Sequence, residues 1–327
     1  MTIIQLVSNR PTDRFYRGGL RITQLRGEPD AKSHEPEDWI ASTTRVAGEE
    51  VKGLTVLPDG RLLTDAIAAD PVAWLGAAHV ARFGVDTKLL VKLLDAGQRL
   101  PVHAHPHADF AREYLARAHG KAEAWYILNG GSVHLGLIRD VDENELAELV
   151  CRQDSAELLS LLHEIPVQPG DAVYVPPGTL HAIGEGTLIL EVQEPEDLSI
   201  LLEWQGFALD GRTDGHLGLG FERALQAVER QSLSAGQRDA LVVRDGRLGS
   251  VLPDSADAYF RLERVVVDGS AAVDAGFAIL LMSRGRLQCE DGTVLAAGAT
   301  AVVSYSTDPL RLEGSAEILI ARPPRAE

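Results

Sequence analysis

The sequence predicts a mainly β protein with two β-rich halves and a helical insertion in the first. Across residues 1–138 and 164–210, short apolar runs alternate with turns rich in Gly, Pro and Asp, and the same pattern returns over residues 258–327. Residues 139–163 instead have apolar side chains at helical spacing. Because short, regularly spaced strands favour barrels or sandwiches, we expect one barrel in each half, joined by a helical linker over residues 211–257.

The first half opens with mixed local structure. A Pro58-Asp59-Gly60 turn predicts a hairpin over residues 55–63. Residues 65–75 predict a short helix that is broken by Pro71.

A strand buried on both faces is predicted over residues 89–95, an apolar run interrupted only by Lys92. Taken alone, a lysine in such a run is expected to snorkel to the surface. After a helix predicted over residues 108–117, further strands are expected at residues 122–128, 132–138, 165–167, 172–175, 187–193 and 199–203.

The second half predicts an amphipathic helix and then only strands. The helix, over residues 217–230, has the period of 3.6. Short strands follow at residues 260–267, 277–282, 286–289, 301–305 and 316–321.

Composition excludes several classes of function. The net charge of −17 on 327 residues argues against nucleic acid and anionic membranes as partners, although local lysines can still form a pocket for a phosphorylated substrate. The two cysteines, Cys151 and Cys289, are far apart, which suits a reducing compartment. With no signal peptide and no apolar run of membrane-spanning length, we expect a cytoplasmic protein.

A candidate metal site begins with His103 and His105. Alternate residues of a strand point to the same face, so these two imidazoles lie roughly 7 Å apart along the strand and can reach one metal ion. On this pair alone, two surface histidines in a polar loop are an equal alternative.

The spacing of neighbouring residues favours the metal. Gly97 precedes His103 by five intervening residues, and six residues separate Glu123 from Gly130. Gly170, Pro176-Pro177-Gly178 and His181 follow a second such pattern. These segments resemble the two cupin motifs G-x5-H-x-H…E-x6-G and G-x5-P-x-G-x2-H. The resemblance implies a bicupin fold of two cupin β-barrels or jelly rolls, with the metal in the first barrel. The ligands it implies are His103, His105, Glu123 and His181.

Seventeen residues separate His105 from Glu123, a longer gap than in ordinary cupins. Glu113 is nearer, but it lies on the predicted helix, and we interpret it as a solvated charge. His107 is a further candidate ligand, although a loop position that faces solvent or substrate is favoured.

The long gap and its flanking blocks resemble class I mannose-6-phosphate isomerases. The matching blocks are residues 90–96, 105–106, 120–128 and 178–184, with partial matches at 16–19 and 37–42. The resemblance implies a metal-dependent aldose–ketose isomerase that acts on a sugar or sugar phosphate through a cis-enediol. The metal it implies is usually zinc, with Mn, Fe, Co or Ni as alternatives.

The resemblance also implies roles for pocket residues. Lys92 and Lys121 would bind substrate and assist catalysis, and Trp125 would contact substrate. Glu191 would point inward as the acid/base, with a salt-bridged carboxylate at the barrel mouth as the alternative.

Three positions depart from that family. His103 stands where the family usually has glutamine, Pro101 replaces a serine, and Leu201 occupies the place of an arginine that is thought to serve phosphate or enediolate charge. Losing that guanidinium weakens the expectation of activity on mannose 6-phosphate, unless Arg212 replaces it.

Two other functions stay open at this point. A non-catalytic sugar-binding cupin would keep the metal, and is favoured by Pro101 and Leu201 but disfavoured by Lys92 in an apolar strand. An Fe(II) cupin oxygenase suits the ligand set but not the residue 120–126 block. We expect a monomer or homodimer, in which the second barrel lacks an HxH pair and serves as a packing partner.

Overall fold

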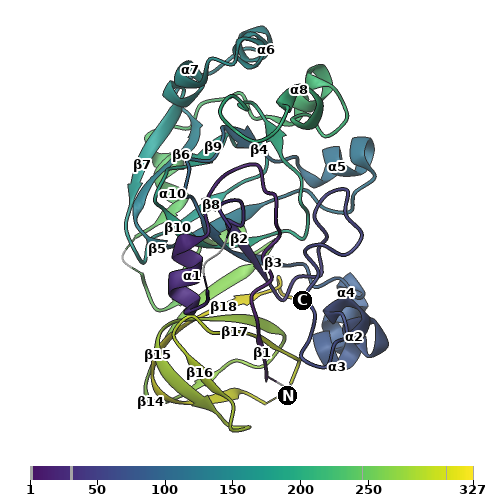
Figure 1. The fold of residues 1–327 in the computed structure, drawn as a ribbon, viewed down its shortest axis with the longest axis vertical. Helices are drawn as coiled ribbons and strands as arrows, with labels where there is room; N and C mark the ends of the chain where they lie inside the picture. Colours follow the sequence, from purple (N-terminus) through teal and green to yellow (C-terminus); the bar gives the residue numbers. More distant parts are fainter. Residues whose placement is uncertain (1–2, 30–31, 245, 307, 327) are drawn as a thin grey trace.

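The computed structural model describes residues 3–29, 32–244, 246–306 and 308–326. As predicted, it is mainly β, with three sheets of antiparallel strands and short helices around them. In Figure 1 the seven-stranded sheet lies at the bottom, and the strands of the other two sheets fill the middle and top of the molecule.

The six-stranded sheet lies at the centre. Its order is β12 (Val242–Val243), β8 (Ala172–Val175), β5 (Glu123–Asn129), β10 (Leu188–Gln193), β3 (Leu90–Asp95) and β2 (Glu37–Ile40).

A five-stranded sheet covers one face of this central sheet. Its order is β11 (Ile200–Leu201), β4 (His103–Ala104), β9 (His181–Ile183), β6 (Gly131–Leu137) and β7 (Leu162–Val167). Apolar side chains of both sheets meet in one core, which includes Ile127 and Ile189 from the central sheet and Leu135 and Ile183 from the five-stranded one. The two sheets therefore form one sandwich, which encloses the site described below.

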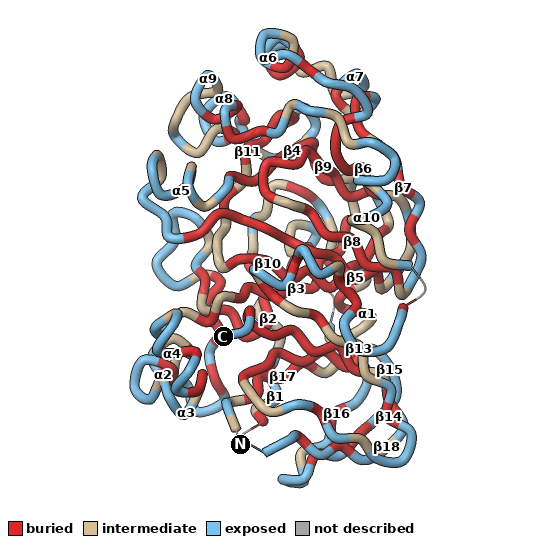
Figure 2. The backbone as a smooth tube through the Cα atoms, turned by 180° about the vertical axis from the view of Figure 1, so that it is seen from behind, coloured by how far each residue is buried: buried red, intermediate tan, exposed pale blue. Residues whose placement is uncertain are grey.

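The opposite face of the central sheet packs on the C-terminal half. Val91 and Leu190 share a hydrophobic core with Phe260, Ile279 and Leu319. Strands β3 and β10 are consequently buried along their whole length, as the apolar run at residues 89–95 predicts (Figure 2).

The C-terminal sheet has seven strands. In order they are β1 (Ile3–Leu6), β17 (Thr300–Val303), β15 (Ala278–Cys289), β18 (Leu310–Arg322), β14 (Arg261–Val273) and β13 (Gly249–Ser250), with β16 (Val294–Ala296) paired to β15. It has a hydrophobic core of its own, which includes Leu280 and Ile318. Its three longest strands run further than the short strands that the sequence predicts.

One strand lies elsewhere than expected. We expected the first residues in the first barrel, but β1 pairs with β17 of the C-terminal sheet. The chain thus crosses between the two halves immediately after its start, a pairing across almost 300 residues that no local pattern encodes.

The helices are short. In chain order they are α1 (Leu20–Arg26), α2 (Leu63–Ala69), α3 (Pro71–Leu75), α4 (Ala77–Phe83), α5 (Ala108–Leu115), α6 (Glu143–Arg152), α7 (Ser155–Ser160), α8 (Gly211–Asp214), α9 (Phe221–Ala224), η1 (Leu225–Ala227), α10 (Ala235–Ala240) and η2 (Asp254–Ala256). The predicted break at Pro71 is confirmed, since Asp70 ends α2 and its side chain caps α3. The helical insertion is confirmed as α6 and α7.

The long helix predicted over residues 217–230 is wrong. Leu217, Gly218 and Gly220 have φ values of 55°, 78° and 77°, and the α-helix is confined to Phe221–Ala224. Positive φ at three of four residues prevents the first turn from forming, and here the glycines outweigh the apolar periodicity.

No helix in the described ranges combines the length and apolar character needed to cross a membrane.

Candidate functional site

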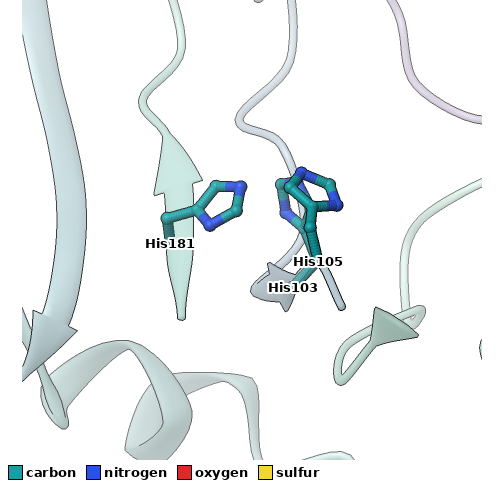
Figure 3. Close-up of side chains that lie close together, drawn as sticks. All are labelled: His103, His105 and His181. Carbon is teal, nitrogen blue, oxygen red and sulfur yellow. The ribbon is translucent and has the colours of Figure 1, made fainter. Parts of the chain in front are cut away.

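Three buried histidines meet inside the sandwich. His103 on β4 and His181 on β9 are direct register partners, and His105 follows β4. Their ring centroids lie 4.0 to 5.0 Å apart, and each offers a ring nitrogen within 4.8 Å of the others. Figure 3 shows His181 on its own strand, facing His103 and His105.

Backbone carbonyls fix the tautomer of all three rings. The Nδ1 atom of His103 lies 2.8 Å from the Pro101 carbonyl oxygen. The Nδ1 atom of His105 lies 2.7 Å from the carbonyl oxygen of Leu198. The Nδ1 atom of His181 lies 2.8 Å from the carbonyl oxygen of Thr179. Because a carbonyl oxygen only accepts, each Nδ1 carries a proton, and Nε2 is the nitrogen of each ring that is left to face a metal. This is the arrangement by which metal-binding histidines are oriented.

The turn before His181 depends on glycine. Gly178 has a φ of +82° and ends the Pro176-Pro177-Gly178 turn. Its backbone N–H donates to the His105 carbonyl at 2.7 Å. The glycine of the second motif thus holds the two histidine segments together.

Glu123 reaches the cluster from β5 of the central sheet. Its Oε2 lies 2.9 Å from Nε2 of His105, and its Oε1 lies 3.2 Å from Nε2 of His181. The Trp125 indole donates to Oε1 at 3.1 Å. Glu123, and not the exposed Glu113, therefore stands beside the histidines.

The cluster fits a divalent metal ion. Burial lowers the pKa of His103 well below its usual range and that of His105 to about 3, so both rings are neutral at neutral pH. Burial acts to raise the pKa of Glu123, but the Lys121 ammonium and the His105 and His181 rings together outweigh burial and hold this pKa well below its usual range. In the described part of the chain, the buried Nε2 of His181 has no hydrogen-bond partner. Neutral imidazoles with a carboxylate suit zinc and related ions.

Lys121 lies directly against this cluster. Its Nζ donates to Oε2 of Glu123 at 2.7 Å and lies 2.8 Å from Nε2 of His105. The ammonium thus provides positive charge at two of the candidate ligand atoms.

A second charged pair crosses the central sheet. Lys92 on β3 and Glu191 on β10 are direct register partners, with Nζ 3.3 Å from Oε2. The Lys92 ammonium lies over the Trp39 ring, 4.8 Å from its centroid, and 3.7 Å from Oε2 of Glu37. Lys92 is only 3% exposed, so the expectation that it snorkels to the surface is wrong.

Glu191 is an unusually placed carboxylate. Burial raises its pKa, and Glu123 adds to this effect although Lys92 opposes it. Among the described residues, its Oε2 accepts no well-formed hydrogen bond, despite the nearby ammonium. A buried carboxylate with a raised pKa and a free oxygen is suited to proton transfer.

Sequence reasoning missed Arg14 and its partners. Arg14 bonds Asp197 through two nitrogens, each at 3.2 Å, and Glu37 at 3.1 Å. Arg14 and Asp197 are 183 residues apart, and no local signal predicts the pair.

Most of the charged groups described above, and His103 of the histidine cluster, border one cavity of about 680 Å³. Its lining includes His103, Lys121, Glu123, Lys92, Glu191, Arg14, Pro101 and Leu201.

His105 and His181 are buried behind that lining, and further residues singled out in the sequence also lie outside it. Trp125 is fully buried beside His181 and holds Glu123 instead of reaching the cavity, which differs from the expectation that it binds substrate. Arg212 is exposed on α8, and His107 is exposed at the start of α5.

Curated relatives of the chain carry the name mannose-6-phosphate isomerase. The enzyme ManA of Bacillus subtilis is 28% identical, over 71% of this chain and 74% of its own. The Streptococcus mutans enzyme is 38% identical, over 55% of this chain and 54% of its own. A further B. subtilis relative, GmuF, is 42% identical over 33% of this chain and 34% of its own, so the match spans about a third of that protein. No family model matches the chain.

Solved structures share the whole fold. The mannose 6-phosphate isomerase from Bacillus subtilis aligns with a TM-score of 0.72 at 22% identity, covering 98% of this chain and 100% of its own. A variant of phosphomannose isomerase from Salmonella typhimurium aligns with a TM-score of 0.75 at 17% identity, covering 99% and 100%. The chain is therefore a divergent relative of the mannose-6-phosphate isomerases and has their fold.

Proposed function

We propose that this protein is a metal-dependent aldose–ketose isomerase, which interconverts mannose 6-phosphate and fructose 6-phosphate or a related sugar pair. The observation that carries the proposal is a buried cluster of three oriented imidazoles and Glu123, which reaches through His103 and Glu123 into the same cavity as the buried Lys92–Glu191 pair. The names of the curated relatives support the same reaction class.

Four side chains would hold the metal, which we propose to be zinc: His103, His105, His181 and Glu123. A divalent ion bound there would polarise sugar oxygens and stabilise the negative charge that develops on them. Lys121 already contacts Glu123 and His105, so its ammonium would have to shift toward the cavity when these ligand atoms are engaged.

The proton transfer falls to Glu191. Isomerisation moves a proton between C1 and C2, and one carboxylate that reaches both carbons can remove and return it. Its raised pKa keeps it a better proton acceptor than an ordinary glutamate. Lys92, held over Trp39 beside Glu191, would orient the carboxylate and donate to a substrate hydroxyl.

A non-catalytic sugar-binding role explains less. Binding alone gives no reason to bury Glu191 with an oxygen that lacks a hydrogen bond, since such burial costs free energy.

The remaining assignments are part of this proposal. We assign residues 1–138 and 164–210 to the metal-binding barrel, apart from β1, and residues 258–327 to the C-terminal one, with residues 139–163 as the insertion and 211–257 as the linker. We propose a cytoplasmic enzyme, monomeric or homodimeric.

Isotope exchange tests the function directly. The zinc- or manganese-loaded protein is incubated in D2O with free and 6-phosphorylated ketoses, and deuterium at C1 or C2 is followed by NMR. We expect exchange that depends on the protein and is abolished by a chelator. Absence of exchange with every sugar, at full metal occupancy, would rule out an isomerase.

A further inference from the structure

The cavity that holds the histidine cluster has no surplus of positive charge. Six carboxylates and four cationic side chains line it. A divalent ion would bring the summed charge of these side chains to zero. The lining would then have no net positive charge to bind a phosphate dianion.

Each buried cation of the lining is already paired with a carboxylate. The pairs are Arg14 with Asp197 at 3.2 Å, Lys92 with Glu191 at 3.3 Å, and Lys121 with Glu123 at 2.7 Å. A phosphate that recruited Arg14 or Lys92 would have to break a buried ion pair and leave a carboxylate uncompensated, which is costly. Lys121, which would shift toward the cavity when a metal engages Glu123, offers a single positive charge to a dianion.

The rest of the lining offers no substitute. Leu201 on β11, the register partner of His103, is 4% exposed and gives this wall a hydrocarbon surface. The fourth cation, Arg117, is exposed, and so are the carboxylates Asp13 and Asp214 of the same lining, so water screens charge in this outer part.

We propose that the site takes a neutral, unphosphorylated sugar as its substrate, an inference that rests on the proposed isomerase function. A phosphate monoester carries about −1.5 to −2 charges at neutral pH and would enter a lining rich in carboxylates. Sugar hydroxyls both donate and accept hydrogen bonds. They can therefore bind to the carboxylates and ammonium groups of the lining while the ion pairs between these groups stay intact.

The test compares matched sugars on the metal-loaded enzyme. Free aldohexoses and ketohexoses are assayed against their 6-phosphates, and binding is measured separately by saturation-transfer NMR. We expect kcat/KM to be at least about tenfold higher for a free sugar, with the same order in binding. A kcat/KM for the phosphate equal to or above that of the free sugar overturns the inference and leaves the isomerase standing.

The two proposals fail in different ways. If no sugar turns over, the isomerase proposal fails, and binding still decides the substrate class. Tighter binding of the free sugar then supports a neutral ligand. Equal or tighter binding of the phosphate, or no binding of a free sugar, overturns it.

A variant adds the missing charge. Leu201→Arg places a guanidinium on the apolar wall, and we expect it to shift the preference toward the phosphate by about tenfold or more. Leu248→Arg adds the same charge at an exposed position outside the cavity lining and should leave the preference unchanged. If Leu201→Arg folds and the preference does not move, the charge argument is wrong; if it does not fold, the wild-type comparison decides.

Discussion

At the scale of single residues, partners from distant strands decide what each polar side chain does. Lys92 illustrates this, because its neighbours in the sequence predict a lysine whose ammonium group is exposed to solvent. Trp39 from β2 and Glu191 from β10 instead flank it across the sheet. Burial alone would lower the pKa of the Lys92 ammonium, but the carboxylates of Glu37, Glu191 and Asp197 together raise it.

Glu191→Gln removes the proposed acid/base and keeps the shape of the side chain. We expect kcat to fall by about 10²- to 10⁴-fold, because general-base catalysis contributes an effect of that size. Metal content should stay the same, since Glu191 lies outside the histidine cluster. Glu164→Gln, on an exposed position of β7, is the control. A Glu191→Gln enzyme within about twofold of wild type would refute this role.

A second residue-scale prediction concerns His119, away from the histidine cluster. Burial acts to lower its pKa, but the hydrogen bond to Asp86 at 2.6 Å and the nearby Glu194 raise it to about 9, against the opposing charge of Lys88. Because the pKa of His119 is higher in the folded than in the unfolded state, its protonation stabilises the fold. This stabilisation is complete at pH values below the unfolded-state pKa, near 6.5, and it is lost as the pH rises through 9.

His119→Gln should therefore cost roughly 1–3 kcal/mol of unfolding free energy near pH 6, and much less near pH 10. Urea denaturation at several pH values measures this difference. His163→Gln is the control, because that ring contacts a backbone carbonyl instead of a carboxylate. A pH-independent difference for His119→Gln would show that the ion pair does not contribute.

At the scale of elements, hydrophobic period and turn residues predict most of the strands. The buried run at residues 89–95 becomes β3, and the Gly and Pro signals mark real turns. The prediction fails where backbone conformation outweighs periodicity, as at Gly218 and Gly220 before α9. It also underestimates β14 and β18, which pair in register over 13 residues.

The two-sided burial of the central sheet has an energetic consequence. Leu190→Ala in β10 opens a cavity in the core shared with the C-terminal sheet, and we expect a loss of about 2–5 kcal/mol in unfolding free energy. Val266→Ala, at a residue that is 47% exposed in the C-terminal sheet, should cost less than about 1 kcal/mol. Urea unfolding compares the two. A loss below about 1 kcal/mol for Leu190→Ala would mean that the interface is loosely packed.

At the scale of the whole molecule, the sequence predicts the mainly β fold and proposes the four candidate ligands that the structure brings together. The spacing of residues within the motifs is enough to predict these ligands. Side chains alternate between the two faces of a strand, and tight turns fix where each strand starts, so the spacing determines which side chains face inward. Arg14 with Asp197, and β1 with β17, could not be predicted. These contacts join segments 183 and almost 300 residues apart, and they depend on how the sheets stack.

The central claim is that the His103–His105–His181–Glu123 cluster binds one divalent metal ion per chain. Elemental analysis of the purified protein after metal loading and dialysis tests it most directly, with His105→Ala, Glu123→Ala and the control His107→Ala measured alongside. We expect about one ion per chain in the wild type and in His107→Ala, and less than about a tenth of that in the other two variants. Unchanged metal content in His105→Ala and Glu123→Ala, or a wild type that retains no metal, would contradict the account.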